Sequence, residues 1–526
     1  MNSELIPLDH TGQFPRLITD YISKKEDIQD FSEYSPNMEG LLKRIEYLNS
    51  STKNTEFLAS VLEEQHANQL SDSQKSNLDT LKSNNALTVC TGHQLCLFGG
   101  PVYMIYKIAS VISLSNRLAS VTGLNVVPIF WMASEDHDVE EVSSISLFGR
   151  RISFASQHQG PVGKMSLKGI DIVLKELDDI LGESQGADSA SQMIKAAYSD
   201  APDMATAFRS LIQGLFGKYG LLILDAADKR LKASFFDSVV TEVKEQLTYS
   251  SIQDTLTMLE SRGESPQASP REVNLFYMLD DSRKRIINND QSIEVLDGPI
   301  WTFEEFKKEL ADFPERFSPN VLFRPVYQEH LLPNIAYIGG PGELSYWLEL
   351  KESFRAFGLK MPVLILRDSF VWLDSRTEKR WNDLGFKAID LFRDEDSLHK
   401  EFAKKNSEEE PDLSDDKETM LRHFDGLIEK SHSIDPGILG FAKSERARLL
   451  KSIDNLEKKL IRAEKKKHSD SLKRISTIRS KFLPGGNLRE RNENFLHWYL
   501  RYGEEFLDML LEMSDPLEPK VKVVKI

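Results

Sequence analysis

Polar side chains cluster directly after two consecutive apolar runs of this chain. The run 86–90 leads into His93 and Gln94, whose side chains can hydrogen-bond a phosphate or a carboxylate. The run 126–132 leads into four ionisable residues, namely Glu135, Asp136, His137 and Asp138. Parallel strands end at the same edge of a sheet, where open α/β folds place their active sites. We therefore interpret the chain as an enzyme with its site at this edge.

The four consecutive ionisable groups favour acid-base or amine-binding chemistry. They repel one another unless a cation, a hydrogen-bond donor or a substrate amine offsets their charge. A carboxylate beside an imidazole can raise its basicity, as a general base requires. We predict catalytic roles for Asp136, His137 and Asp138 and substrate binding for Glu135. A solvated turn is the alternative, and a metal site would need distant ligands, so no metal is assigned.

Glycine loops precede two expected helices, and glycine lets backbone N–H groups approach an anion closely. Pro101 and Pro341 are preset for the first turn of these helices. The loops could instead serve only to reverse the chain. The two aromatic residues that follow the second loop could instead pack in the core. We predict substrate binding by Gly92. We predict nucleotide or oxyanion binding by Gly99, Gly100, Gly339, Gly340, Gly342, Glu343, Tyr346 and Trp347.

Two arginines are candidate carboxylate clamps, because a guanidinium binds carboxylates bidentately. Arg324 and Arg367 each lie at the end of an expected strand. Structural pairing with Asp368 or Glu329 is the alternative. We predict that both arginines bind substrate, with His93 and Gln94 helping.

The elements that would position these residues alternate between strands and helices. Short apolar runs at 86–90, 126–132, 221–224, 321–326, 335–338 and 363–366 are typical of buried parallel strands. Helical patterns at 38–48, 55–70, 102–118 and 204–219 precede or separate them. The sequence therefore predicts an α/β fold with a parallel-sheet core.

Composition divides the chain further. Residues 150–204 and 241–317 lack the strand-helix rhythm and are interpreted as insertions 1 and 2. The predicted domains are 1–149 (N-terminal helices and first half of the core), 150–204, 205–240 (core), 241–317, 318–407 (second half of the core), 408–418 (acidic linker) and 419–526 (helical coiled-coil domain and tail).

The last of these domains carries an apolar stripe. Leu449, Ile453, Leu456, Leu460 and Ala463 repeat at 4-3-4-3 spacing, which predicts a coiled-coil helix or a helical hairpin. The seam needs a partner, so we predict a homodimer through residues 442–482. The stretch 443–481 holds 14 Lys plus Arg against 5 Asp plus Glu. We interpret these as solvated or paired side chains and predict no nucleic-acid binding.

Bulk properties exclude several classes. The 526 residues carry a net charge of −16, which disfavours general binding to nucleic acids or anionic membranes. Two cysteines, Cys90 and Cys96, exclude a disulfide framework, and nothing nearby in the sequence would activate either thiol. No run of 18 apolar residues and no leader-like start are present, so we expect a cytoplasmic protein without a membrane segment.

Taken together, these motifs resemble the BshC family of bacillithiol biosynthesis over nearly the whole chain. The residues that carry the resemblance are Thr91–Gln94, Gly100–Pro101, Pro128–Trp131, Glu135–Asp138, Arg271–Phe276, Arg324–Pro325, Gly339–Glu343, Tyr346–Trp347 and Pro362–Phe370. The family usually carries another residue at the position of His93. The resemblance implies a Rossmann-type core with two connecting-peptide insertions and a C-terminal α-helical coiled coil that dimerises.

The resemblance also implies a reaction. L-cysteine would be joined through an amide to glucosaminyl-malate in the last step of bacillithiol biosynthesis, with ATP or ADP as the natural candidate cofactor. The alternative from the residues is a nucleotide-binding, class I synthetase-like or nucleotidyl-transfer protein associated with tRNA. A clear KMSKS-like lysine loop, which that class would carry, is absent from the sequence.

Overall fold

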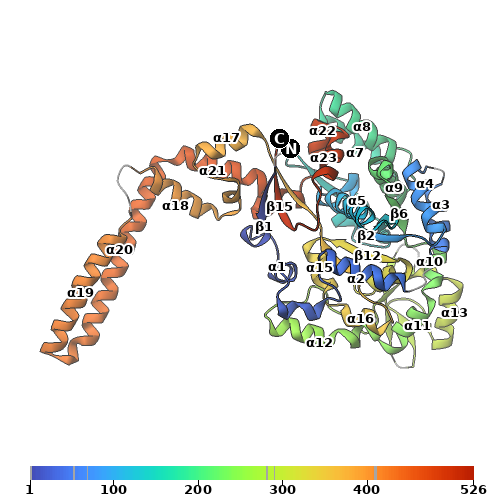
Figure 1. The fold of residues 1–526 in the computed structure, drawn as a ribbon, viewed down its shortest axis with the longest axis horizontal. Coiled ribbons are helices and arrows are strands. Elements are labelled where there is room, and N and C mark those ends of the chain that lie inside the picture. The colour runs from blue at the N-terminus through green and yellow to red at the C-terminus, as the bar shows by residue number, and fades with distance from the viewer. Residues whose placement is uncertain (1–2, 51–53, 68, 280–281, 290, 408–411) are drawn as a thin grey trace.

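The protein consists of a large body and a long helical arm (Figure 1). The structure is a computed structural model that describes residues 3–50, 54–67, 69–279, 282–289, 291–407 and 412–526. None of the helices in these ranges combines the length and the apolar character that crossing a bilayer requires.

A five-stranded parallel sheet forms the centre of the body, in the order β13-β12-β2-β3-β6. Its strands are β2 (Leu87–His93), β3 (Val126–Met132), β6 (Leu222–Asp225), β12 (Asn334–Gly339) and β13 (Val363–Leu366). They confirm five of the predicted strands and the α/β class. The chain extends the sheet from β2 through β3 to β6, then returns to the other side of β2 with β12. Ligands in such sheets bind where the strand order reverses, here between β2 and β12.

Helices cover both faces of this sheet. Helices α2 (Met38–Asn49) and α5 (Tyr103–Thr122) share an apolar cluster with residues of β12 and β13. Helices α3 (Thr55–His66), α14 (Arg324–Leu331) and α15 (Pro341–Trp347) share another cluster with Cys90 and Ile129 on the opposite face. The strands are therefore buried on both sides, as their unbroken apolar sequences predict.

A second, antiparallel sheet lies largely within residues 241–317, in the order β10-β9-β8-β7-β11. Its strands are β7 (Leu275–Leu279), β8 (Ser282–Asn288), β9 (Ile293–Val295), β10 (Ile300–Trp301) and β11 (Phe317–Pro319), flanked by α12 (Leu247–Ser261) and α13 (Phe303–Asp312). Residues 150–204 form β5 (Arg150–Ser153), which pairs with β4 (Ser144–Leu147), and the helices α7 (Ile170–Leu181) and α8 (Gln185–Tyr198).

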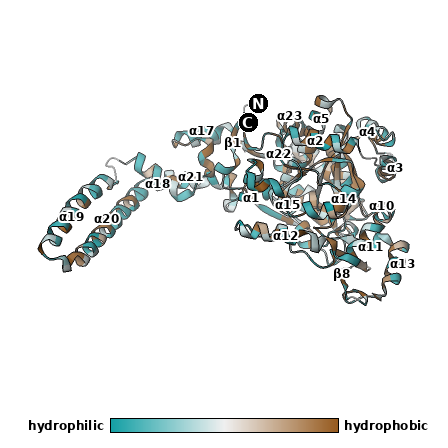
Figure 2. Ribbon diagram, turned by 60° about the horizontal axis from the view of Figure 1, so that its bottom comes forward, coloured by the Kyte–Doolittle hydropathy of each residue, from teal (hydrophilic) through white to brown (hydrophobic). Residues whose placement is uncertain are grey.

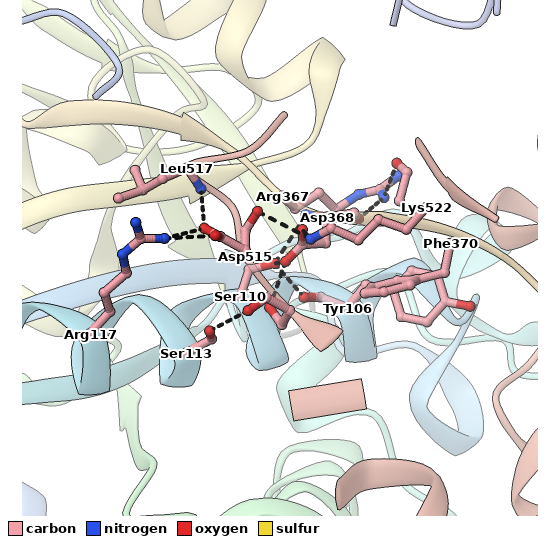
Figure 3. Close-up of polar contacts among 12 residues, drawn as sticks. Tyr106, Ser110, Ser113, Arg117, Arg367, Asp368, Phe370, Asp515, Leu517 and Lys522 are labelled. Atoms are coloured by element: carbon pink, nitrogen blue, oxygen red, sulfur yellow. Dashed lines mark hydrogen bonds and ion pairs between the residues drawn. The ribbon is translucent and has the colours of Figure 1, made fainter. Parts of the chain in front are cut away.

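The two ends of the chain meet in a third sheet. Strand β15 (Lys520–Lys525) pairs antiparallel with β1 (Ser3–Pro7) and parallel with β14 (Ser369–Leu373). A buried network beside β14 and β15 ties the C-terminal segment to α5 (Figure 3). In it Asp368 accepts hydrogen bonds from Lys522, from Ser514 and from Ser110. The C-terminal strand is therefore part of the body, which the sequence patterns did not predict.

Three predicted elements differ from the structure. Residues 321–326 are not a strand, because Asn320 Oδ1 accepts hydrogen bonds from the N–H groups of Leu322 and Phe323 and Pro325 stands in the first turn of α14. Residues 488–513, whose apolar pattern predicts one amphipathic helix, instead form two helices, α22 (Leu496–Tyr502) and α23 (Glu505–Met513), separated at Gly503 with φ +58°. Of the predicted acidic linker, 408–411 lie outside the described residues and 414–418 begin α19 (Ser414–Ile434).

The arm is a helical hairpin. Helix α19 lies alongside α20 (Leu439–Lys467), and α17 (Ser375–Asp383), α18 (Glu395–Lys405) and α21 (Ser469–Phe482) connect the hairpin to the body (Figure 1). Ile453 is buried, whereas Leu456 and Leu460 remain 53% and 37% exposed. Some basic side chains pair within the chain, including Lys465 with Asp396.

Candidate active site

The carboxyl ends of the central strands open into a pocket of about 420 Å³. Gly92 lines it at the end of β2, Ser134 and Ala226 line it after β3 and β6, and α14 and α15 contribute Arg324 and Glu343. The antiparallel sheet closes one side through Arg283 of β8 and Ser318 of β11. Both the position and the size are those of small-molecule sites.

Asp136 is the member of the predicted catalytic trio that lines this pocket. Its Oδ2 accepts a hydrogen bond of 2.7 Å from Gln94 Nε2, which also donates to Glu141 Oε2 at 3.0 Å. Its Oδ1 accepts one of 2.7 Å from the His137 N–H. Burial alone would raise the pKa of Asp136, but the hydrogen bonds from His137 and Gln94 and the nearby Arg283 charge hold it well below its usual range. Asp136 is therefore a persistent anion.

The other two members of the trio do not line the pocket. The His137 side chain is 47% exposed, and its Nδ1 lies 3.4 Å from Arg283 Nη1. Asp138 caps the short helix α6 (Val139–Val142) by accepting a hydrogen bond of 3.0 Å from the Glu141 N–H. The pocket geometry thus assigns Asp138 an N-cap role instead of the predicted catalytic one.

Glu135 lines the pocket and forms an ion pair with a buried lysine. Lys232 Nζ lies 2.6 Å from Glu135 Oε2 and also donates to the Phe317 carbonyl at 3.1 Å. Burial lowers the pKa of Lys232, although the charge of Glu135 opposes that effect. The sequence analysis did not assign a role to Lys232, because its position in the chain is distant from every motif.

A second buried ion pair joins the two predicted glycine-loop regions. Lys107 Nζ donates to Glu343 Oε1 and Oε2 at 2.9 and 2.7 Å and to the Gly92 carbonyl. The same carboxylate accepts hydrogen bonds from the Tyr337 hydroxyl at 2.9 Å and from the Gly340 N–H at 2.8 Å. Lys107 is fully buried, so it holds the wall of the pocket together.

The two glycine loops do not have the anion-binding role that we predicted for them. The Gly340 N–H is occupied by Glu343, and Gly339, Gly340 and Gly342 do not line the pocket. The N–H groups of Gly99 and Gly100 donate to the carbonyls of Cys96 and Leu97, and both glycines are buried away from the pocket. Neither loop fits a nucleotide phosphate, and no residue is assigned to one. Among the described residues, no cluster of His, Cys, Asp and Glu could hold a metal ion.

His93 and Tyr103 line the pocket side by side. His93 Nε2 lies 3.1 Å from the Tyr103 hydroxyl and its Nδ1 lies 2.9 Å from the Gln94 carbonyl. Burial lowers the pKa of His93 to about 4, so the imidazole is neutral at neutral pH. Burial also raises the pKa of the Cys96 thiol to about 12, which leaves it unreactive.

The two predicted arginines have different surroundings. Arg324 lines the pocket within 6 Å of the rings of Trp131 and Tyr337, and its Nη1 donates to Gln328 Oε1 at 3.0 Å. Arg367 does not line it: its Nη2 lies 2.7 Å from Glu490 Oε1, with both side chains buried. Structural pairing with Glu490 therefore replaces the predicted clamp role of Arg367.

The aromatic residues that follow the second glycine loop also separate. Tyr346 lines the pocket, whereas Trp347 is fully buried and stacks on the Tyr337 ring at 4.1 Å. Trp347 is thus a core residue, which was the alternative stated from the sequence.

Arg283 is the pocket residue that the sequence analysis missed most clearly. Its Nη2 donates to Ser318 Oγ at 3.0 Å and to the Pro319 carbonyl at 2.9 Å. The guanidinium also lies 4.2 Å from the centre of the Phe276 ring. Only the pairing of β7 with β8 and β11 brings these residues together.

Comparison with known proteins gives a consistent result over the whole chain. Residues 1–368 match the family model "Bacillithiol biosynthesis BshC, N-terminal Rossmann-like domain", and residues 370–526 match "Bacillithiol biosynthesis BshC, C-terminal coiled-coil domain". The boundary between the two models falls at the start of β14.

Relatives named "Putative cysteine ligase BshC" align from end to end. The protein from Christiangramia forsetii is 37% identical, covering 100% of this chain and 99% of the relative. The one from Flavobacterium johnsoniae is 35% identical, covering 100% of both. The one from Bacillus cereus is 27% identical, covering 97% of this chain and 98% of the relative.

Proposed function

The chain belongs to the BshC family of bacillithiol biosynthesis, and on that premise we propose that it is an amide-forming ligase that joins L-cysteine to the amine of glucosaminyl-malate. The observation that carries this proposal is the charge distribution in the pocket. Asp136 and Glu141, which line the pocket and are bridged by Gln94, present carboxylate oxygens to an ammonium group, and Arg324 presents a cation to a carboxylate. An aminosugar that bears malate carries both kinds of group.

Asp136 would orient the amine. A group whose pKa lies far below neutrality is a poor general base but a reliable partner for an ammonium ion. Its hydrogen bonds with Gln94 and the His137 N–H fix the carboxylate in place, so the ammonium group is held in one position. The ammonium group would release a proton to solvent before its nitrogen attacks the activated carboxyl carbon of cysteine, and the activating phosphate or nucleotide would leave as the C–N bond forms.

Amide formation from a free carboxylate needs activation, and we propose ATP as the cosubstrate. The glycine loops do not fit its phosphates, so the proposal rests on the chemistry of the reaction alone. We also propose that the protein works in the cytoplasm, where its buried free thiols, Cys90 and Cys96, stay reduced.

The arm is proposed as a homodimer interface. Large apolar side chains on both helices of the hairpin are exposed, among them Met420 (49%), Leu427 (48%), Phe441 (69%) and Leu456 (53%). Figure 2 shows apolar residues along both helices. A second copy would cover these exposed apolar side chains.

The test is product formation by the purified protein. L-cysteine, glucosaminyl-malate and ATP are incubated with it, and bacillithiol is quantified by mass spectrometry. We expect the product with wild-type protein, and a loss of about 10- to 100-fold in kcat/KM for Arg324→Met, since a hydrogen bond to a charged group contributes about 1.5–3 kcal/mol. Exposed Arg376→Met is the matched control. Absence of bacillithiol with every nucleoside triphosphate would refute the ligase proposal.

A further inference from the structure

We propose that Arg283 makes this site select acceptors that carry a carboxylate next to their amine. The inference rests on the proposed function and adds the residue that distinguishes glucosaminyl-malate from a simple glucosaminide. Arg283 lies on β8 and lines the same pocket as Asp136.

The guanidinium is held rigidly. Nη2 is fixed by Ser318 Oγ and the Pro319 carbonyl, and the Phe276 ring supports one face of the group. Such a fixed guanidinium loses little entropy when its Nη1 donates to a carboxylate. Its position is therefore set before any ligand enters.

The charge of Arg283 lacks a direct partner. Within the described part of the chain it forms no ion pair with a carboxylate, and its buried Nε has no hydrogen-bond partner. Burial lowers the pKa of the group, and the charges of Glu135 and Asp136 act in the opposite direction from a distance. A desolvated guanidinium in this state gains from an anionic ligand.

The arrangement also matches the geometry of the acceptor. In glucosaminyl-malate the amine is on C2 of the sugar and malate is attached through oxygen to the adjacent C1, so a cationic and an anionic substituent lie on neighbouring sugar carbons. The site must place a cation beside its amine-binding carboxylate. Arg283 meets this requirement because it lines the same pocket as Asp136, and its charge adds to the effect of the His137 and Gln94 hydrogen bonds that lower the pKa of that carboxyl.

Binding selectivity tests the inference without turnover. Calorimetry measures the Kd of glucosaminyl-malate and of methyl glucosaminide, which has the amine but no carboxylate, for wild-type protein and Arg283→Gln. Glutamine keeps a polar side chain with the same Cβ and Cγ but removes the charge. We expect the Kd of glucosaminyl-malate to rise about 10- to 100-fold in the variant, and that of methyl glucosaminide to change less than about twofold.

Two further variants sharpen the result. Exposed Arg285→Gln on the same strand is the control and should leave both Kd values unchanged. Arg283→Lys retains the charge and should recover part of the affinity, and a melting curve verifies that each variant folds. If Arg283→Gln does not fold, the comparison of Arg283→Lys with wild type decides, because lysine lacks the fixed, planar guanidinium and should still weaken glucosaminyl-malate binding selectively.

The outcomes separate the two proposals. Equal loss of affinity for both ligands, or no loss, would overturn the role of Arg283. Wild-type protein that binds glucosaminyl-malate through Arg283 but forms no amide would refute the ligase proposal alone. Wild-type protein that does not bind glucosaminyl-malate would overturn both.

Discussion

Asp136 and Asp138 are two residues apart in the sequence but have different surroundings. Asp136 accepts from Gln94 inside the pocket, whereas Asp138 caps α6 at the surface. His137 lies between them with its ring near Arg283 and half exposed. The motif alone does not distinguish these residues, but their contacts in the structure assign them different roles.

Asp136→Asn is expected to lower kcat/KM about 10- to 100-fold, because the amine loses a charged partner. Asp138→Asn is the matched control: asparagine caps helices as well as aspartate does, so activity and melting temperature should stay near wild type. Steady-state kinetics and thermal melts check both variants. Equal losses of activity in the two would contradict the assignment.

A pH-dependent stability term is expected from His66 in α3. Burial lowers its pKa to about 4, its Nδ1 lies 2.7 Å from the Leu62 carbonyl, and its Nε2 accepts from the Ile223 N–H. The unfolded chain binds a proton near pH 6.5 and the folded chain only near pH 4. The free energy of unfolding should therefore fall as the pH drops from about 6.5 to 4, by about 3 kcal/mol from this group.

His66→Gln removes the titrating group, and glutamine offers both a donor and an acceptor. Urea unfolding at several pH values should show a smaller slope for this variant between pH 4 and 6.5. The same slope in both proteins would show that His66 does not cause it.

At the scale of elements, the turn from β12 to α15 is defined by a single carboxylate. Glu343 accepts from Lys107, Tyr337 and the Gly340 N–H, so the glycines of this turn serve the pocket wall instead of a ligand. The effect of replacing each glycine with a larger residue depends on the atoms that lie next to it.

Gly340→Ala should destabilise the protein by about 1–3 kcal/mol and lower activity, because its Cβ would lie 3.3 Å from Glu343 Oε2. A Cβ at Gly342 would have no neighbour within 4 Å, so Gly342→Ala should be neutral or slightly stabilising. Chemical denaturation distinguishes the two variants. A marked loss of stability in Gly342→Ala would mean that the turn has another packing constraint.

Breaking the ion pair beneath this turn should cost more. Glu343→Gln leaves the fully buried Lys107 without its carboxylate, and such a change costs about 3–5 kcal/mol. Lys107→Met with Glu343→Gln should recover part of that loss, because the uncompensated charge is removed. A double-mutant cycle of unfolding free energies measures the coupling, and additive losses would contradict it.

On the scale of the whole molecule, the arm projects from a body whose two chain ends are joined in one sheet (Figure 1). The arm is anchored through α17, α18 and α21, while the hairpin beyond them exposes apolar side chains. Packing within the hairpin buries Ile453 but leaves Leu456 and Leu460 exposed.

Leu456→Glu together with Leu460→Glu should convert the proposed dimer into monomers, since charges on an apolar seam oppose its burial. Light scattering gives the mass, and circular dichroism verifies that helix content is kept. Lys458→Glu, placed on another side of α20, is the control. A dimer that persists in the double variant would place the contact elsewhere.

Local patterns in the sequence were sufficient for the class of fold and for the region of the site. Continuous apolar runs identified five buried parallel strands, and such strands must end at one edge, which located Gly92, Gln94, Glu135 and Asp136 together. The 4-3-4-3 stripe identified the arm, because helical periodicity is a property of neighbouring residues.

Tertiary structure decided which of these residues face the pocket and what occupies their polar groups. Arg283 lies on a strand about 150 residues beyond Asp136 in the sequence. Glu490, which forms the ion pair with Arg367, is more than 100 residues away from it. The Glu343 carboxylate occupies the Gly340 N–H that we predicted would bind an anion, because Lys107 of another helix holds the carboxylate there. Long-range ion pairs and cross-strand contacts depend on how elements pack, and no local spacing in the sequence encodes them.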